Sequence, residues 1–312
     1  MPKRKTVVLG LGGNALIKPG QKGRLSEQLQ NVDNAMKHVA KLVKRGWNLI
    51  LTHGNGPQGG GILLQNEMSK RSVPEMPLYV CVAESQGQIG YMIQESLYNR
   101  LHRIGADKPI VTVITQVIVN RKDTAFRNPT KPIGPFYPKK SMIKRGWKFI
   151  KTEEGFRRVV PSPEPMRIVE ADAIKKIKDD AIVIACGGGG VPVISGKGGK
   201  GLIGVDAVID KDLTAEKLAN IVRADMLIIL TDVDAVYLNY DKPSQRVLRR
   251  ASLSEIKRYY KEGHFPEGSM GPKIQASIRF LEKSRSKRKV IITSFDLLDR
   301  ALEGRAGTLI ER

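Results

Sequence analysis

Cysteine is scarce in this chain of 312 residues, which contains only Cys81 and Cys186. Both lie inside apolar segments, and neither belongs to a C-x-x-C pair or lies near a histidine in the sequence. A zinc site built from cysteine and histidine needs such spacings, and a disulfide framework needs more cysteines. We therefore expect two buried thiols in a reducing compartment, which favours the cytoplasm, and no zinc site.

Long apolar runs are also missing. No segment approaches the roughly 20 apolar residues of a membrane-spanning helix. The basic residues 1–5 are followed by an apolar run that reaches Gly12-Gly13 within a few positions, which is too short for a secretory signal. The sequence therefore predicts neither a membrane span nor a signal peptide.

Aromatic residues make up only 5% of the chain, whereas the net charge is +22. The basic residues are spread along the sequence, and their one dense run, residues 283–289, is predicted to be a solvated loop. No aromatic stacking motif accompanies them, which argues against binding of single-stranded nucleic acid. The charge is compatible with a field that attracts a phosphorylated substrate or with a nucleic-acid surface, and its cause stays open.

Glycine turns follow two predicted strands. Residues 6–11 and 48–52 are apolar runs typical of buried strands, and they lead into Gly12-Gly13-Asn14 and Gly54-Asn55. Glycine turns allow backbone N–H groups to point toward an anion, although a simple tight turn needs the same residues. Because parallel strands end at the same edge of a sheet, we expect the two turns to face each other.

Helical periodicity and further apolar runs continue this alternation. We predict helices at residues 26–44, 58–69 and 84–104, and a third strand at 110–115. A strand–helix–strand alternation predicts a largely parallel sheet covered by helices on both faces. His53, at the end of the second strand, is expected to be a core imidazole bonded to backbone rather than a catalytic group.

The alternation lapses between about residues 121 and 165. The proline-rich residues 128–137 are unsuited to a helix or to a central strand, and residues 148–151 and 157–160 could pair as a hairpin. We predict a small excursion outside the main sheet. Its Lys131 lies between Thr130 and Pro132, which would stiffen the backbone and reduce the entropy lost on ligand contact, although an exposed loop lysine is the simpler interpretation.

Another predicted strand, residues 181–186, leads into four consecutive glycines at 187–190, which suit a close approach between backbone and ligand. A helix should follow such a turn in a dinucleotide-binding fold, but residues 191–194 are not helical in pattern. A dinucleotide-binding fold is therefore not predicted.

Charges alternate at Asp210-Lys211-Asp212, between an apolar run and a helical pattern. Such charges are costly to desolvate unless they meet partners or a charged ligand. The simpler interpretation is a solvated loop with Asp212 as the helix N-cap. Farther on, residues 268–273 open another helix, and Lys273 at its start opposes the helix dipole, which favours a bound anion nearby.

Taken together, these segments resemble the carbamate kinases, members of the amino acid kinase fold family. The most specific matches are residues 128–137 (NPTKPIGPFY) and 269–273 (SMGPK). The resemblance runs nearly end to end, through residues 11–16, 52–58, 128–137, 157–163, 186–193, 207–213, 231–234 and 268–273. Related amino acid kinases carry a lysine just before the first Leu-Gly-Gly, where this chain has Gly10, so Lys131 is the expected replacement.

The resemblance implies reversible phosphoryl transfer between ATP and carbamate, giving ADP and carbamoyl phosphate. It also implies Mg²⁺ carried by the nucleotide, with no metal ligand assigned to the protein, and a homodimer. The catalytic residues implied are Lys131, Lys211, Lys273 and Asp210. Those implied for substrate and phosphate binding are Gly12, Gly13, Asn14, Gly54 and Asn55, and those for nucleotide binding are Gly188, Gly189, Asp232, Tyr237 and Met270.

We therefore predict an open three-layer αβα sandwich with a mainly parallel central sheet and a small protruding subdomain. Residues 1–205 would form the lobe for carbamate or carbamoyl phosphate, residues 121–165 the protruding subdomain, and residues 206–312 the nucleotide lobe. Two alternatives remain: a kinase of the same fold for another small acid or phosphate, and a non-catalytic protein that binds nucleotide or nucleic acid. The sequence leaves the direction of the reaction in the cell open.

Overall fold

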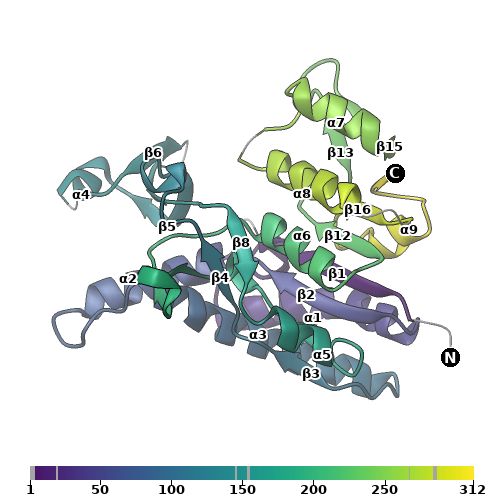
Figure 1. Cartoon of the computed structure of the whole chain (residues 1–312), viewed down its shortest axis with the longest axis horizontal. Coiled ribbons are helices and arrows are strands. Elements are labelled where there is room, and N and C mark those ends of the chain that lie inside the picture. Colours follow the sequence, from purple (N-terminus) through teal and green to yellow (C-terminus); the bar gives the residue numbers. More distant parts are fainter. Residues whose placement is uncertain (1–3, 19, 145, 153–154, 267, 284–286) are drawn as a thin grey trace.

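An eight-stranded sheet forms the centre of the molecule (Figure 1). In spatial order its strands are β15 (Arg250–Ser252), β17 (Thr308–Glu311), β16 (Lys289–Thr293), β12 (Met226–Leu230), β1 (Thr6–Leu11), β2 (Asn48–His53), β9 (Ile182–Ile184) and β3 (Ile110–Thr112). The computed structural model describes residues 4–18, 20–144, 146–152, 155–266, 268–283 and 287–312. Within this sheet β16 and β17 are antiparallel, and the other neighbouring pairs are parallel.

β1 lies in the middle of the sheet and is buried along its whole length, as is β2. Successive side chains of a strand point to opposite faces. Leu9 accordingly packs into the hydrophobic core on one face, and Val8 packs into the core on the other. Both faces are therefore covered, which explains why these strands are continuous apolar runs rather than alternating ones.

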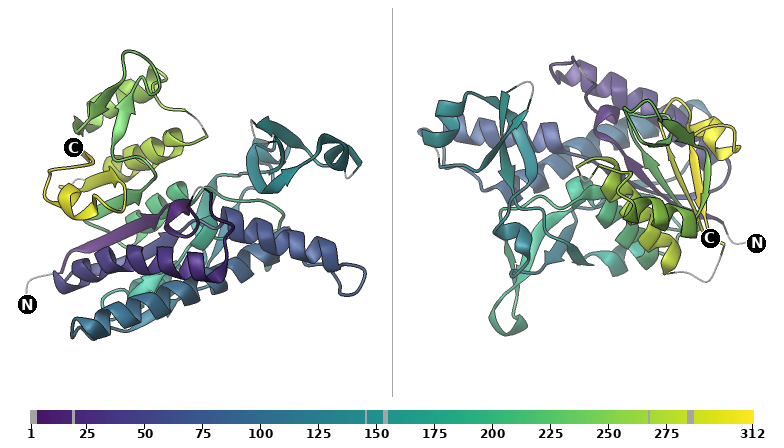
Figure 2. Two further views of the ribbon diagram at one scale, coloured as in Figure 1. Left: turned by 180° about the vertical axis from the view of Figure 1, so that it is seen from behind. Right: turned by 90° about the horizontal axis from the view of Figure 1, so that it is seen from above.

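Helices form the two outer layers, as Figure 2 shows from two further sides. One layer contains α1 (Leu25–Lys44), α3 (Leu78–Arg103) and α9 (Leu298–Leu302). The other contains α5 (Ala171–Ile177), α6 (Lys211–Ile221), α7 (Leu253–Lys261) and α8 (Met270–Glu282). The predicted three-layer αβα sandwich is confirmed.

Smaller sheets lie beside this core. A four-stranded sheet has the order β11 (Leu202–Gly204), β10 (Val191–Ser195), β4 (Gln116–Val119) and β8 (Pro165–Ile168), and β13 (Val236–Leu238) pairs with β14 (Arg246–Leu248). The predicted strand at 110–115 is too long, because β3 ends at Thr112. The chain leaves the main sheet there, since the Thr115 N–H donates to Oε1 of Gln86 at 2.8 Å.

The protruding subdomain stands apart from the main sheet in Figures 1 and 2. Its sheet has the order β5 (Lys131–Tyr137), β7 (Gly155–Val160) and β6 (Phe149–Thr152), and α4 (Lys139–Lys144) accompanies it. The predicted hairpin is confirmed, with Phe149 opposite Arg158. The proline-rich segment is an edge strand, where a missing N–H leaves no gap in the hydrogen bonding between strands.

Three further sequence predictions concern the basic run, the lobe boundary and membrane spans. The basic run at 283–289 falls partly on residues 284–286, which lie outside the described residues. The predicted lobe boundary near residue 205 stays a prediction, because the central sheet takes strands from both halves of the chain. In the part of the chain that is described, no helix combines the length and apolarity that crossing a membrane requires.

Candidate active site

Two glycine turns meet at the carboxyl ends of β1 and β2. The Gly54 N–H donates to the carbonyl of Leu11 at 3.2 Å, which ties the second turn to the end of β1. A Cβ placed on Gly13 would meet no atom within 4 Å, whereas one on Gly54 would lie 3.5 Å from Cδ of Lys211. The first turn therefore faces open space and the second lies against a lysine, as an anion site requires. The side chain of Asn14 lies outside the described part of the structure, so its role stays a prediction.

Asn55 is buried at the base of this site, where its Nδ2 donates to Oγ of Ser85 at 2.8 Å. A Cβ on Gly188 would lie 2.2 Å from Cγ of Asn55, and one on Gly189 would lie 2.3 Å from the carbonyl oxygen of Ile209. Any side chain at either glycine would therefore push these segments apart. Because Gly188 and Gly189 have no side chains, the turn after β9 can lie directly against Asn55 and Ile209 around one cavity.

That cavity has a volume of about 250 Å³ and lies between the glycine turns, the start of α6 and the start of β5. The described residues that line it include Gly13, Gly54, Asn55, Lys131, Gly188, Asp210, Lys211 and Lys273. The structure thus brings together the three lysines and both glycine turns that the sequence placed in separate segments. Gly12 lies against the backbone of Leu230, where an added Cβ would be 2.8 Å from its carbonyl oxygen.

Asp210 is the N-cap of α6. Its Oδ1 accepts hydrogen bonds from the N–H groups of Asp212 at 2.9 Å and Leu213 at 3.3 Å. Its Oδ2 accepts from Nζ of Lys131 at 2.9 Å. One carboxylate therefore fixes both the first turn of a helix and the lysine that comes from the protruding subdomain.

Asp212 is not the cap that its sequence position suggested, and that prediction is wrong. α6 begins at Lys211, two residues earlier than a cap at Asp212 would require, so Asp212 lies inside the helix. Its side chain is buried and accepts from Nζ of Lys211 at 2.6 Å and from Nζ of Lys273 at 3.0 Å. Asp212 therefore holds two of the three lysines, and Asp210 holds the third.

The charges in this cluster shift one another's pKa values. Burial works to raise the pKa of Asp212, but the two lysines outweigh it and hold the pKa well below its ordinary range. Burial lowers the pKa of Lys211, with Asp212 opposing this and Lys273 adding to it. Burial also opposes the charge of Lys273, yet Asp212 raises the pKa of that lysine above its ordinary value. The cluster is thus a buried carboxylate shared by two ammonium groups, with lysine charge in excess.

His53 is fully buried beside these groups, and its Nδ1 lies 2.9 Å from the carbonyl oxygen of Gly54. Burial lowers the pKa of this imidazole to about 4, and Lys211 contributes in the same direction. The ring is therefore neutral at physiological pH. The expected core imidazole bonded to backbone is confirmed.

A second cavity of about 490 Å³ adjoins the first, and Gly268, Ser269 and Lys273 line both. Asp232, Tyr237 and Met270 line the second cavity, together with Tyr240 and Phe265. Aromatic side chains beside a few polar groups are typical of a site for a planar ring. In the part of the chain that is described, Gly188 and Gly189 do not border this cavity, so they lie apart from the other residues expected to bind nucleotide.

The residue that sequence reasoning missed is Asp212. The sequence did single it out as the second acid of Asp210-Lys211-Asp212. However, the start of the helix was predicted too late in the sequence, so Asp212 was interpreted as the N-cap. Chemically, the whole arrangement can bind an anion with lysines and backbone N–H groups. It can also hold a planar ligand next to that anion.

Comparisons with known proteins agree with this geometry. The model of the amino acid kinase family matches residues 5–294. Carbamate kinases of Thermococcus kodakarensis and Pyrococcus horikoshii are 48% and 49% identical to the chain, each covering 99% of both sequences. The structure of carbamate kinase from Giardia lamblia bound to AMP-PNP superposes with a TM-score of 0.92 at 43% identity, over 100% of this chain and 99% of that one. The chain therefore belongs to the amino acid kinase family and, within it, to the carbamate kinases.

Proposed function

We propose that this protein transfers a phosphoryl group reversibly between ATP and carbamate, giving ADP and carbamoyl phosphate. The observation that carries the proposal is the meeting of Lys131, Lys211 and Lys273 around one small cavity, which shares a wall with the aromatic-lined cavity. The first cavity would hold carbamoyl phosphate, and the second would hold the nucleotide. The relative solved with AMP-PNP supports the assignment of a nucleotide site to this fold.

The reaction needs little covalent help from the protein. In the direction of ATP synthesis, an oxygen of the ADP β-phosphate forms a bond to phosphorus while the bond from phosphorus to the carbamoyl oxygen breaks, and carbamate leaves. Phosphoryl transfer spreads negative charge over the equatorial oxygens, so positioning and electrostatic stabilisation supply most of the catalysis. Lys211 and Lys273, held by Asp212, would meet this charge from one side, and Lys131, held by Asp210, from the subdomain.

No group in the site has to act as a general base, because carbamate and ADP are both ionised at neutral pH. This agrees with a neutral His53, whose Nδ1 already faces a backbone carbonyl. The backbone N–H groups at Gly12 and Gly13 would hold the transferred phosphate, and Gly54 and Asn55 would hold the carbamate end. Gly13, Gly54 and Asn55 line the cavity, which supports their assignments. The assignment of Gly12 rests on its place beside Gly13 in the same turn.

Mg²⁺ would enter with the nucleotide. Among the described residues, no group of three or more His, Cys, Asp or Glu side chains could hold a metal ion. Magnesium commonly keeps several waters and binds through substrate phosphates, so an ion carried by ATP or ADP would need no such cluster. Bound there, it would neutralise part of the phosphate charge, and the protein's own lysines would stabilise the rest.

The test is to mix the purified protein with carbamoyl phosphate, ADP and Mg²⁺ and to measure ATP. ATP should form only when all three are present. Acetyl phosphate and other small acyl phosphates, each offered in place of carbamoyl phosphate and in competition with it, would distinguish a kinase of another small acid. No ATP above the blank without enzyme would contradict the proposal.

We also propose a homodimer that forms through α3. Tyr91 and Tyr98 lie seven residues apart on this helix and therefore on one face, and they are 62% and 64% exposed. The neighbouring edge strand β3 exposes Val111, and a Cβ on Gly90 of α3 would lie 2.3 Å from Cγ2 of Thr112, so helix and strand are in close contact. This face would be covered by a second copy of the chain. A cytoplasmic location stays a prediction.

A further inference from the structure

Lys131 reaches the cavity from a subdomain that lies outside the main sheet, so something must fix where that subdomain rests. One contact stands out on α2 (Gly56–Ser69), the helix that follows the second glycine turn. A Cβ placed on Gly60 would lie 2.5 Å from Cα and 2.6 Å from N of Gly134. β5 therefore rests directly on α2, backbone against backbone, three residues after Lys131.

This contact requires a glycine at one position of α2. Glycine in the middle of a helix costs roughly 0.5–1 kcal/mol relative to alanine, yet α2 contains Gly59, Gly60 and Gly61 in succession. A Cβ on Gly61 would meet nothing within 4 Å, and one on Gly59 would find only ordinary contact with Asn55. Of the three, only Gly60 lacks room for a side chain, and the atoms that it would displace belong to the backbone of β5.

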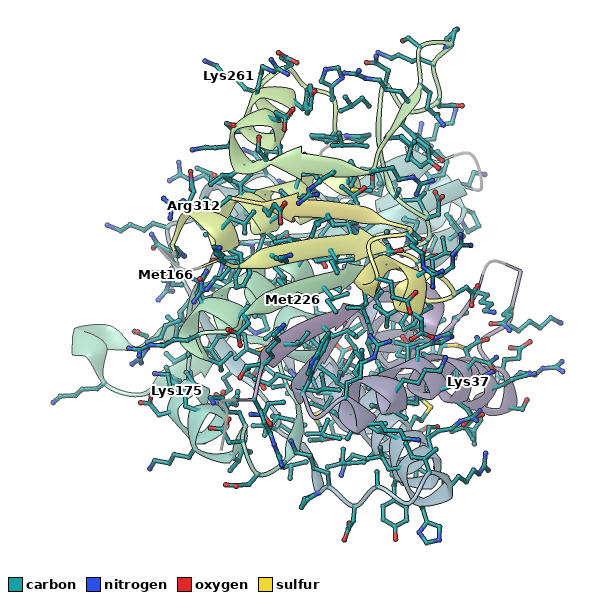
Figure 3. The ribbon with its side chains drawn as sticks, turned by 90° about the vertical axis from the view of Figure 1, so that its right-hand side faces the viewer. Lys37, Met166, Lys175, Met226, Lys261 and Arg312 are labelled. Carbon is teal, nitrogen blue, oxygen red and sulfur yellow. The ribbon has the colours of Figure 1, made fainter. Side chains whose placement is uncertain are left out.

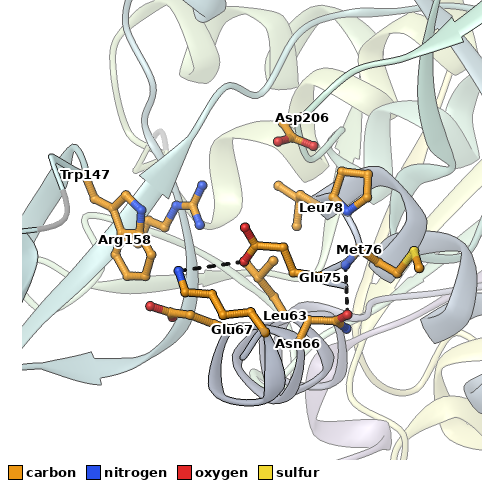
Figure 4. Close-up of a pocket in the computed structure, with 11 residues that line it drawn as sticks. Leu63, Asn66, Glu67, Glu75, Met76, Leu78, Trp147, Arg158 and Asp206 are labelled. Atoms are coloured by element: carbon orange, nitrogen blue, oxygen red, sulfur yellow. Dashed lines mark hydrogen bonds and ion pairs between the residues drawn. The ribbon is translucent and has the colours of Figure 1, made fainter. Parts of the chain in front are cut away.

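A second feature involves Arg158 on the neighbouring strand. Arg158 of β7 lies opposite Ile133 of β5, and its guanidinium lies 4.5 Å from the centre of the Trp147 ring. Figure 4 shows this guanidinium pointing into a cavity of about 600 Å³ between the subdomain, α2 and the start of α3. Glu67 of α2 and Asp206 line the same cavity.

The two carboxylates complement the charge of Arg158. Burial lowers the pKa of its guanidinium, while Asp206 and Glu67 act to raise it. Asp206 lies four residues before Asp210, the partner of Lys131. The subdomain thus presents two cations to residues 206–210: Arg158 to Asp206 at the start of this segment, and Lys131 to Asp210 at its end.

We propose that Gly60 is a positioning residue: it seats β5 on α2 at the depth from which Lys131 reaches the transferring phosphoryl group, and Arg158 holds that seat from the adjacent strand. The inference rests on the proposed function, because it concerns the catalytic use of Lys131. Gly60 has no side chain to offer a ligand, although its backbone lines the same cavity as Lys131. It acts through the position of the subdomain.

The test compares Gly60→Ala with Gly61→Ala, two identical changes on the same helix. Gly60→Ala should lift β5 and lower kcat for ATP formation by roughly 100-fold, a typical cost of misplacing a catalytic group by about 1 Å. The Kd for ADP, whose cavity is lined by other elements, should stay unchanged. Gly61→Ala should match the wild type in both. A Gly60→Ala variant that is folded by circular dichroism and keeps wild-type kcat would overturn the inference.

A double-mutant cycle tests whether the effect passes through Lys131. In a Lys131→Ala background, Gly60→Ala should change kcat by less than about twofold, because the group that it displaces is already gone. The same loss in both backgrounds would show that Gly60 acts elsewhere. A wild type that makes no ATP would instead contradict the proposed function, so the two failures are distinguishable.

Arg158→Met provides an independent arm if Gly60→Ala does not fold. It should lower kcat with an unchanged Kd for ADP, and its effect should also vanish in the Lys131→Ala background. Arg157→Met is the matched control, because this neighbouring arginine lies over the Phe136 ring, within the subdomain, at 5.5 Å. Equal losses of kcat in the two arginine variants, or none in Arg158→Met, would contradict the role of Arg158.

Discussion

Asp212 gathers two of the three lysines of the site into one buried cluster. Its two carboxylate oxygens have different partners: Oδ1 accepts from Nζ of Lys211, and Oδ2 accepts from Nζ of Lys273. Removing one partner of a buried ion pair is costly because the remaining charge stays buried without compensation. Removing the charge of Asp212 would leave both lysines without this compensating negative charge.

Asp212→Asn should therefore reduce both activity and stability. At neutral pH we expect a loss of about 3–5 kcal/mol in the free energy of unfolding, the usual cost of breaking a buried pair. The pKa of Asp212 is lowered in the folded protein, so its stabilising effect is complete above the ordinary value of 3.8 and declines as the pH falls below it. The difference between wild type and variant should shrink accordingly on acidification, as urea denaturation at several pH values would measure.

The control for this experiment is Asp241→Asn, since Asp241 is exposed and has a positive φ that asparagine tolerates. This variant should unfold like the wild type at every pH. If Asp212→Asn were as stable as Asp241→Asn at neutral pH, the shared carboxylate would have no structural importance.

The sequence predicted the lysines of the site better than the acids that hold them. Lys131, Lys211 and Lys273 each had a distinctive context, and all three line one cavity. The two aspartates flank Lys211 symmetrically, so their roles depend on which residue starts the helix. Helix boundaries are uncertain by one or two residues from sequence, and that shift exchanged the cap and the buried partner.

At the scale of elements, β5 carries Lys131 to the cavity from outside the main sheet. Lys131 is its first residue and is fixed by Asp210 at 2.9 Å. β1 has Gly10 near its end and offers no cation there, whereas β5 brings a positive charge to the cavity. Under the proposed function, this edge strand would be part of the active site.

Lys131→Ala should lower turnover by orders of magnitude and leave the fold intact, because the side chain is partly exposed and its loss opens no core cavity. Turnover of ATP formation and a circular dichroism spectrum would measure the two effects. Lys148→Ala is the control, since that exposed subdomain lysine donates only to the carbonyl of Arg127 in the described contacts. Near-normal turnover in Lys131→Ala would remove this lysine from the site.

The elements themselves were largely predictable, because periodic apolar patterns identify long helices and buried strands. What the sequence could not predict was the placement of β5. Its prolines excluded a helix and a central strand, but the contact with α2 depends on Gly60 and Gly134 approaching from distant segments. Contacts of this kind arise only when the whole fold assembles.

At the scale of the whole molecule, the positive charge is dispersed. Lys37, Lys175 and Lys261 project from three different helices in Figure 3, and all three are exposed. A dispersed charge of +22 raises the potential around the entire surface and would speed the approach of anionic substrates at low salt.

The proposed dimer can be tested at this scale. Light scattering should give the mass of two chains for the wild type, and Tyr98→Glu should shift it toward one chain by placing a charge in the interface. Met68→Glu is the control, because Met68 is 78% exposed but lies on another helix, α2. A wild type that stays monomeric at micromolar concentration, or a Tyr98→Glu variant that stays dimeric, would contradict an interface on α3.

The central position of β1 has a consequence for how the protein responds to its metabolites. β1 pairs with β2, which carries the second glycine turn, and with β12, which leads to Asp232 in the nucleotide cavity. Ligands in either cavity would therefore tighten the same strand and favour the folded chain by mass action. A cell rich in ATP and ADP would thus also protect this protein against heat, and its thermal tolerance would follow the concentration of these nucleotides.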